Sequence, residues 1–231
     1  MKTVAIFARK GGVGKSTISF NLACHAARSG IKSMLISMDP QGDSIRWANK
    51  DRPLRMDDLF ISEHGFKTLY LPYSRERETD LGLGKMGLNL LIIDMPPVHE
   101  AIDHVKPDLW VIPVDGRNAI IDTMPCIKHM KTKCPHIAWL PNRINAGGES
   151  AASAIREALA ELGDQVLPEV ADSAVIARSG EASTPVWKAP FPGMGATMLV
   201  NACDSILDLC GLVKTPSTPS STKRNPSRRR R

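Results

Sequence analysis

A glycine-rich run near the start of the chain has the composition of a phosphate-binding loop. It reads Lys10, Gly11, Gly12, Val13, Gly14, Lys15, Ser16 and Thr17. The glycines let the backbone curl tightly, so that consecutive N–H groups and the N-terminus of a following helix converge on an anion. Lys15 would bring a positive charge to the outer phosphates, and the Ser16 hydroxyl would be a ligand of Mg²⁺. We therefore expect this run to bind the phosphates of a nucleotide together with magnesium.

The spacing of the run departs from the common P-loop pattern, because Arg9 stands where that pattern requires its first glycine. The form present here, Lys-Gly-Gly-x-Gly-Lys-Ser/Thr, resembles the deviant Walker A loop of the ParA/MinD family of dimeric ATPases. In that family the first lysine of the run, Lys10 here, reaches the nucleotide of the partner subunit. The resemblance implies ATP as the nucleotide and a homodimer that forms with ATP, with Lys10 and Lys15 both serving catalysis.

The segment that follows the second apolar run extends the resemblance. Residues 39 to 42 read Asp-Pro-Gln-Gly, as ParA-like proteins do at this place. The resemblance implies that Asp39 orients the attacking water near Mg²⁺, which suits a carboxylate because phosphoryl transfer depends mainly on positioning and charge stabilisation. Many relatives have a second aspartate two residues earlier, where this chain has Ser37, and that departure concerns the outer shell of the metal. An Asp-Pro that merely ends a strand is the structural alternative.

Two further strand ends resemble nucleotide-contacting positions of the family. Asp94 closes the apolar run of residues 90 to 93 and precedes Pro96 and Pro97, which matches the Walker B strand. The resemblance implies that Asp94 holds the hydration shell of Mg²⁺; a buried strand with a chance terminal aspartate is the alternative. Asn142, within Leu-Pro-Asn-Arg, resembles the asparagine that contacts adenine, and its alternative is a turn-capping role.

Basic residues in two regions are candidates for DNA contacts. Arg178 lies where ParA proteins place such contacts, although Glu169 stands where relatives often have a basic residue; a solvated arginine is the alternative. Residues 214 to 231 hold seven of the 30 Lys and Arg and no Asp or Glu, which leaves 23 Lys and Arg against 24 Asp and Glu elsewhere. A polycation binds DNA by counterion release, and the alternative is a dispensable tail. The tail candidates are Lys223, Arg224, Arg228, Arg229, Arg230 and Arg231.

The alternation of apolar runs with helix-like stretches predicts the fold class. It predicts an α/β P-loop NTPase fold with a mostly parallel twisted sheet covered by helices on both faces. In such sheets ligands bind at the carboxyl ends of the strands. Strands are expected at residues 4–8, 34–37, 68–73, 88–94, 109–114 and 137–140, amphipathic helices at 149–162 and 195–211, and loops or short irregular helices at 52–66 and 74–87.

Length and composition favour one globular domain. A chain of 231 residues with 42% hydrophobic content can bury one sizeable core. We expect an ATPase domain over residues 1–213, without a preceding helix-turn-helix domain, and a disordered basic tail over 214–231, which has no aliphatic or aromatic residue. The five cysteines form no Cys-x-x-Cys pair and are expected as buried thiols, and the histidines lack metal-ligand spacing.

The combined features predict a ParA-type ATPase for DNA partition or cargo positioning. The resemblance implies that the ATP-bound dimer binds DNA without sequence preference and that a ParB-like or cargo-adaptor protein stimulates hydrolysis, in the cytoplasm and on the nucleoid. Two alternatives are a MinD-like ATPase that binds membranes and a nucleotide-dependent DNA-binding adaptor with negligible turnover. Acidic residues on the polar face of the expected last helix argue against stable membrane anchoring, because anionic lipid favours a basic face.

Overall fold

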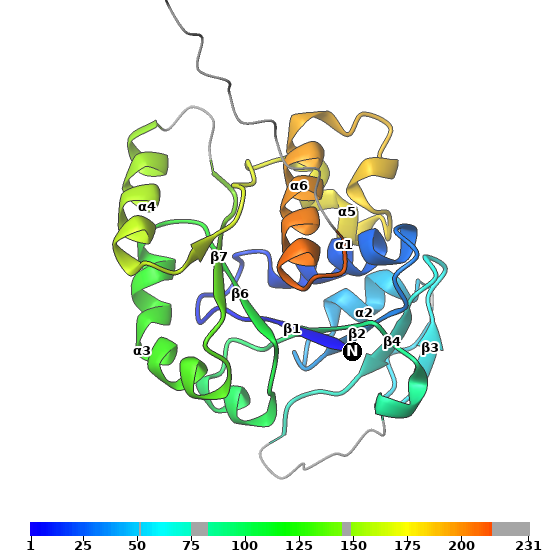
Figure 1. The fold of residues 1–231 in the computed structure, drawn as a ribbon. Helices are drawn as coiled ribbons and strands as arrows, with labels where there is room; N and C mark the ends of the chain where they lie inside the picture. The colour runs from blue at the N-terminus through cyan, green and yellow to red at the C-terminus, as the bar shows by residue number, and fades with distance from the viewer. Residues whose placement is uncertain (51, 75–82, 145–148, 214–231) are drawn as a thin grey trace, which may run out of the picture.

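The computed structural model describes residues 1–50, 52–74, 83–144 and 149–213, and eight strands within them form a single sheet (Figure 1). The order across the sheet is β3-β4-β2-β5-β1-β6-β7-β8, and every neighbouring pair is parallel except β3 and β4. The strands are β1 (Lys2–Ile6), β2 (Ser33–Ser37), β3 (Leu59–Ile61), β4 (Lys67–Tyr70), β5 (Leu90–Asp94), β6 (Leu109–Val114), β7 (Ile137–Pro141) and β8 (Gln165–Val166). The predicted α/β fold is confirmed.

Helices cover both faces of the sheet (Figure 1). α3 and α4 contribute to the apolar cluster on one face, and α1, α2, α5 and α6 to the cluster on the other. The helices are α1 (Lys15–Arg28), α2 (Asp43–Ala48), α3 (Arg117–Lys133), α4 (Glu149–Leu162), α5 (Ala174–Glu181) and α6 (Gly193–Leu209), with short 3₁₀ segments η1 (Leu83–Met86), η2 (His99–His104) and η3 (Val186–Lys188). Among the described helices none has the length and apolar content needed to cross a membrane.

The central strands are apolar along their whole length because both of their faces are covered. Every residue of β2, β5, β6 and β7 is buried. The predicted helix at 149–162 is confirmed as α4, whose Ala152, Ile155 and Leu159 face the core. All five cysteines are buried free thiols, as predicted.

One edge strand was not predicted, and the bounds of two other elements differ from the prediction by a few residues. β3 lies within a stretch predicted as loop or irregular helix, because this three-residue edge strand leaves Leu59 and Ile61 45% and 71% exposed and so lacks an inward apolar pattern. The strand expected at 68–73 is β4 and ends at Tyr70, and the last helix is shifted to Gly193–Leu209. Residues 75–82 of the other predicted loop, and the tail from 214, lie outside the described residues.

Asp204, one of the acidic residues on the polar face of α6, contacts a buried histidine of α1. Its Oδ1 lies 2.6 Å from Nε2 of His25 on α1, and His25 is 2% exposed. Burial lowers the pKa of His25 more than the hydrogen bond and charge of Asp204 raise it. The pair therefore links α1, the helix that follows the glycine-rich run, to α6 through a buried imidazole.

Parallel pairing brings the chemically important strand ends to one edge. Asp94 is in register with Ile6 on one neighbouring strand and with Ser37 on the other. The carboxyl ends of β6 and β7 reach the same edge, because both strands run parallel to β1. The loops that follow these five strands therefore lie together at the carboxyl end of the sheet, where ligands bind in parallel α/β folds.

Candidate functional site

The glycine-rich run forms a tight loop between the end of β1 and the start of α1. Gly12 and Gly14 have φ angles of 76° and 94°, in the left-handed region that favours glycine. A Cβ on Gly14 would lie 2.6 Å from Nδ2 of Asn142, so a larger residue would also clash there. Gly14 is the N-cap of α1 and no side chain caps the first N–H groups of that helix. These groups are therefore available to an anion such as a phosphate.

Lys15 lies beside the two aspartates that the sequence singled out. It is only 7% exposed, and burial lowers its pKa while the charges of Asp94 and Asp39 raise it. Asp39 follows β2 and its Oδ1 accepts a hydrogen bond of 2.9 Å from the backbone N–H of Gln41, which shapes the turn. A buried ammonium that interacts electrostatically with two carboxylates at an open helix N-terminus forms a charge arrangement suited to polyphosphate and a divalent cation.

Asp94 has the properties expected of a residue that supports Mg²⁺. It is fully buried, and burial raises its pKa to about 6. Hydrogen bonds from the Ser44 and Ser16 hydroxyls and the charge of Lys15 lower the pKa, but by less than burial raises it. Its Oδ2 accepts a hydrogen bond of 2.7 Å from Ser44, whereas Oδ1 has no hydrogen-bond partner within the described residues. A buried carboxylate oxygen without a partner fits the second coordination shell of Mg²⁺, so the residues fit this ion.

This site would not resemble a metal centre built from protein ligands alone. Among the described residues no three His, Cys, Asp or Glu side chains gather into a group that could hold a metal ion. Magnesium in nucleotide sites usually keeps several waters and takes phosphate oxygens together with one or two protein ligands. The Ser16 hydroxyl and the carboxylate of Asp94 satisfy that smaller requirement.

Lys10 is held by an ion pair within its own chain. Its Nζ lies 2.8 Å from Oδ1 of Asp115, which follows β6, and the two side chains are 39% and 14% exposed. Asp115 was not singled out from the sequence. The signal that could have found it is a carboxylate directly after a buried parallel strand, the same signal that marked Asp94.

Asn142 and Arg143 hold the glycine-rich loop from the end of β7. Asn142 is buried and its Nδ2 donates a hydrogen bond of 2.7 Å to the carbonyl of Val13. Arg143 donates from Nη1 to the carbonyl of Gly12 at 3.2 Å and from Nε to Asp172 at 3.4 Å. A cavity of about 230 Å³ opens beside these residues and the loop. Its position beside the loop supports the expected placement of a nucleoside base next to Asn142.

Arg178 is exposed on α5, a helix that packs against α1 and against α2, the helix that follows Asp39. α5 contacts α2 where Gly180 faces the ring of Trp47, and a Cβ on Gly180 would lie 2.5 Å from that ring. Glu169, which stands where a basic residue was anticipated, pairs with Arg156 at 2.6 Å, so its charge is partly balanced. The basic tail candidates, Lys223, Arg224 and Arg228 to Arg231, lie outside the described residues.

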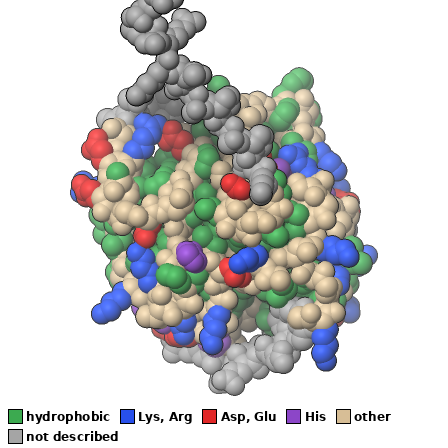
Figure 2. Space-filling model, in the orientation of Figure 1, with side chains coloured by type: hydrophobic (Ala, Val, Ile, Leu, Met, Phe, Trp, Pro, Cys, Tyr) green, Lys and Arg blue, Asp and Glu red, His purple; other side chains and the backbone are tan. Residues whose placement is uncertain are grey.

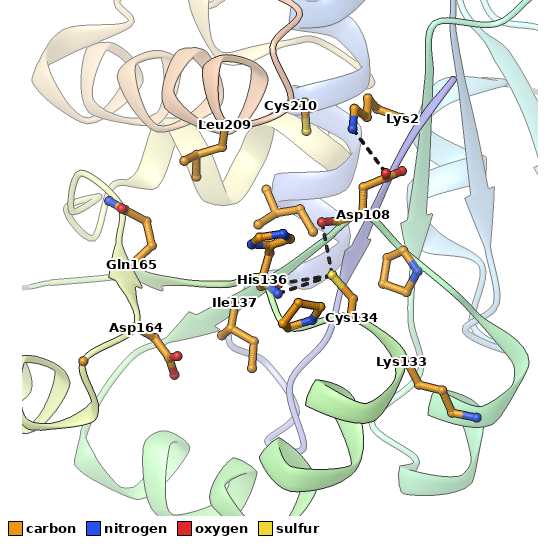
Figure 3. A pocket seen from close by; sticks show the side chains of 14 residues that line it. Lys2, Asp108, Lys133, Cys134, His136, Ile137, Asp164, Gln165, Leu209 and Cys210 are labelled. Atoms are coloured by element: carbon orange, nitrogen blue, oxygen red, sulfur yellow. Dashed lines mark hydrogen bonds and ion pairs between the residues drawn. The ribbon is translucent and has the colours of Figure 1, made fainter.

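A larger cavity of about 600 Å³ lies at the opposite edge of the sheet (Figure 3). Its carboxylates already have cationic partners, since Lys2 pairs with Asp108 at 3.3 Å and Lys131 with Asp164 at 2.8 Å. The thiol of Cys134 donates to the carbonyl of Asp108 at 3.1 Å. The glycine-rich loop and both site aspartates are at the carboxyl edge, so the candidate nucleotide site lies there and not in this cavity.

The chain is similar to a known family of nucleotide-binding domains. The sequence matches the CobQ/CobB/MinD/ParA nucleotide binding domain over residues 4–186. It is 40% identical over 62 residues to the chromosome-partitioning ATPase Soj of Treponema pallidum (strain Nichols), a match that covers 27% of this chain and only 24% of the length of Soj.

Solved structures show the same fold at low sequence identity. The MinD cell division protein of Aquifex aeolicus has a TM-score of 0.75 and 16% identity, covering 94% of this chain and 99% of that one. A putative plasmid partition protein from Borrelia burgdorferi B31, bound to AMPPNP, has a TM-score of 0.67 and 17% identity, covering 90% and 98%. Because the family match spans most of the chain and includes the loop and both aspartates, this protein belongs to the CobQ/CobB/MinD/ParA family of nucleotide-binding domains.

Proposed function

We propose that this protein is a ParA-type ATPase that partitions DNA or positions another intracellular cargo by cycling between ATP-bound and released states. The observation that carries the proposal is the convergence of Lys15, Asp39 and Asp94 beside the uncapped N-terminus of α1. Family membership supports nucleotide binding, and the names of the relatives, Soj and the plasmid partition protein, support a role in partition.

Each residue of the site has a separate role in this proposal. The loop N–H groups and Lys15 bind the phosphates of ATP, and Asn142 lies beside the base. Asp39 holds and orients the attacking water, and Ser16 and Asp94 hold Mg²⁺, the latter through water. Magnesium bound there would neutralise charge on the β- and γ-phosphates.

The proposed active state is a homodimer that forms with ATP. Lys10 is suited to act in trans, because it lies at the exposed rim of the site and its present partner Asp115 holds it only through a partly exposed ion pair. Ion pairs of this kind contribute about 0–1 kcal/mol, so contact with a triphosphate on a second subunit would compete readily with Asp115.

Non-specific DNA is the proposed surface on which the dimer works, with a ParB-like or cargo-adaptor protein as the activator of hydrolysis. Arg178 is an exposed cation on a helix that packs against the segment following Asp39. On the face drawn in Figure 2, Lys and Arg are interspersed with Asp and Glu instead of forming one basic patch. The basic residues of the tail, 214–231, are the second proposed DNA contact, because seven Lys and Arg without any Asp or Glu attract phosphate, and the proposed location is the cytoplasm and the nucleoid.

The test measures ATP hydrolysis and binding of a random-sequence DNA duplex by the full chain, with Lys15→Ala and Asp39→Ala as variants. Lys15→Ala should lose ATP binding. Asp39→Ala should keep ATP-dependent dimerisation and DNA binding but hydrolyse ATP at least about 10²-fold more slowly. Lys2→Ala and Asp208→Ala, which change exposed or paired residues far from the loop, are the matched controls and should behave as wild type.

The outcomes separate the alternatives. Wild-type turnover in Asp39→Ala would remove Asp39 from the mechanism. ATP-dependent DNA binding without measurable turnover, even with the cognate adaptor, would identify a DNA-binding adaptor. Binding to vesicles of anionic lipid but not to DNA would identify a MinD-like membrane-associated ATPase.

A further inference from the structure

The carboxylate of Asp94 is held by a residue from a distant part of the chain. Ser44 lies in the first turn of α2, is fully buried, and donates from Oγ to Asp94 Oδ2 at 2.7 Å. The two residues are 50 positions apart. Hydrogen bonds to an ionised carboxylate are among the stronger ones in proteins, so this contact defines the orientation of the side chain.

The backbone before Ser44 is built to direct it to Asp94. Gly42, the N-cap of α2, has a φ of 64°, and a Cβ there would lie 2.5 Å from Leu54 and 3.0 Å from Tyr70. The hydroxyl of Tyr70 donates to the carbonyl of Pro40 at 2.8 Å, which anchors the same turn. The segment that begins with Asp39 therefore brings Ser44 to the end of β5 through a turn whose left-handed φ favours glycine.

The hydrogen bond leaves the two oxygens of Asp94 in different situations. Oδ2 is occupied by Ser44, whereas Oδ1 is buried and has no hydrogen-bond partner within the described residues. The terminal torsion of an aspartate is broad, so an unrestrained carboxylate would exchange its two oxygens by rotation. The Ser16 hydroxyl, itself an expected Mg²⁺ ligand, also interacts with this carboxylate and lowers its pKa. With Oδ2 held by Ser44, Oδ1 is the oxygen that stays available to a cation or its water.

We propose that Ser44 is a positioning residue for the Mg²⁺ site, which holds the Asp94 carboxylate with Oδ1 presented to the hydration shell of the ion. This inference rests on the proposed function, because it assumes that Mg²⁺ binds with the nucleotide. Because Ser44 belongs to α2, the carboxylate of Asp94 is held in this way only while the segment from Asp39 to α2 packs against β5. Partners that orient metal-supporting carboxylates typically change metal affinity 10- to 100-fold when removed.

The experiment titrates MgCl₂ into the full chain with a fluorescent ATP analogue and compares the Mg²⁺ concentration at half-saturation with nucleotide affinity in EDTA. Ser44→Ala should raise the half-saturating Mg²⁺ concentration about 10-fold or more and leave affinity in EDTA within about twofold of wild type. Ser33→Ala is the matched control, because Ser33 is also a buried serine but its Oγ has no hydrogen-bond partner among the described residues. It should leave both quantities unchanged.

A merely structural role for Ser44 would lower thermal stability without moving the Mg²⁺ requirement. An unchanged half-saturation in folded Ser44→Ala therefore overturns the proposal. Ser44→Cys, which retains a weak donor, supplies a second measurement if Ser44→Ala fails to fold, and its half-saturation should also rise; a wild-type value overturns the proposal. Failure of nucleotide binding, the part of the proposed function on which this inference rests, is distinct, because wild-type protein would then not bind the analogue or would bind it without any dependence on Mg²⁺.

Discussion

Nζ of Lys10 lies 2.8 Å from Oδ1 of Asp115 in the same chain, so the first lysine of the glycine-rich run is turned towards its own subunit. Asp115 follows β6, the strand beside β1, and this neighbourhood explains the contact. If Lys10 serves a partner subunit, this ion pair must open when the dimer forms.

Asp115→Asn is predicted to favour dimerisation. Removing the charge frees Lys10. A partly exposed pair contributes at most about 1 kcal/mol and one such pair opens in each subunit, so with ATP the dimer should form at up to about 30-fold lower protein concentration. Analytical ultracentrifugation measures this directly, with Asp122→Asn on the exposed side of α3 as the control. A weaker dimer would mean that Asp115 orients Lys10 for its contact and does not restrain it.

Mg²⁺-dependent nucleotide binding is predicted to fall at acidic pH. The pKa of Asp94 is raised to about 6, so the carboxylate that supports the ion becomes protonated below that pH. The half-saturating Mg²⁺ concentration should be constant between about pH 7 and 8 and rise about tenfold per unit below 6. Asp94→Asn should need a higher half-saturating Mg²⁺ concentration at every pH and should lack the rise that is due to protonation of Asp94. The variant thereby separates this rise from the effect of protonating the nucleotide.

The same group is predicted to reduce stability at neutral pH. Its folded pKa lies above the ordinary value of 3.8, so the folded chain binds the extra proton between these two values. The free energy of unfolding of the nucleotide-free protein should therefore fall as pH rises from about 4 to about 6. Asp94→Asn should raise the Tm at pH 7.5, and a lower Tm would show that the buried carboxylate is better compensated than its unpartnered Oδ1 indicates.

Gly180→Ala is predicted to disturb the contact between α5 and α2. The new Cβ would lie 2.5 to 2.6 Å from ring atoms of Trp47, whose ring also packs edge-to-face on Phe20 at 6.2 Å. Overpacking of this kind lowers the free energy of unfolding by about 1–3 kcal/mol, measurable by urea denaturation. Gly84→Ala, where a Cβ meets no atom within 4 Å, is the control. Equal stability of the two variants would show that the Trp47 ring moves without cost.

His25 is predicted to make the protein sensitive to acid. Burial lowers its pKa below 6.5, so the unfolded chain binds a proton more readily and stability is lost as pH falls below about 6.5. His25→Gln, which keeps a donor for Asp204, should show a smaller loss of unfolding free energy between pH 7.5 and 5 than wild type. An identical loss would assign the acid sensitivity to other groups.

The features that could be predicted from the sequence are those that depend on a few consecutive residues. The glycine-rich run, Asp39 and Asp94 were predicted as site residues because their motifs resemble those of the ParA/MinD family and because parallel strands align their carboxyl ends at one edge. The alternation of apolar strands with helices predicted the parallel sheet. β3 was missed because its outward apolar residues reverse the pattern that burial produces.

Only the tertiary structure decided which side chains meet across long distances in the chain. Ser44 on Asp94, Lys10 on Asp115, Asn142 on the carbonyl of Val13 and His25 on Asp204 join residues 50 to 179 positions apart. Periodicity defines which face of an element is buried, but a hydrogen bond forms or fails over a few tenths of an ångström. Those offsets depend on how helices pack on the sheet, so the residues that orient the site are visible only once the chain is folded.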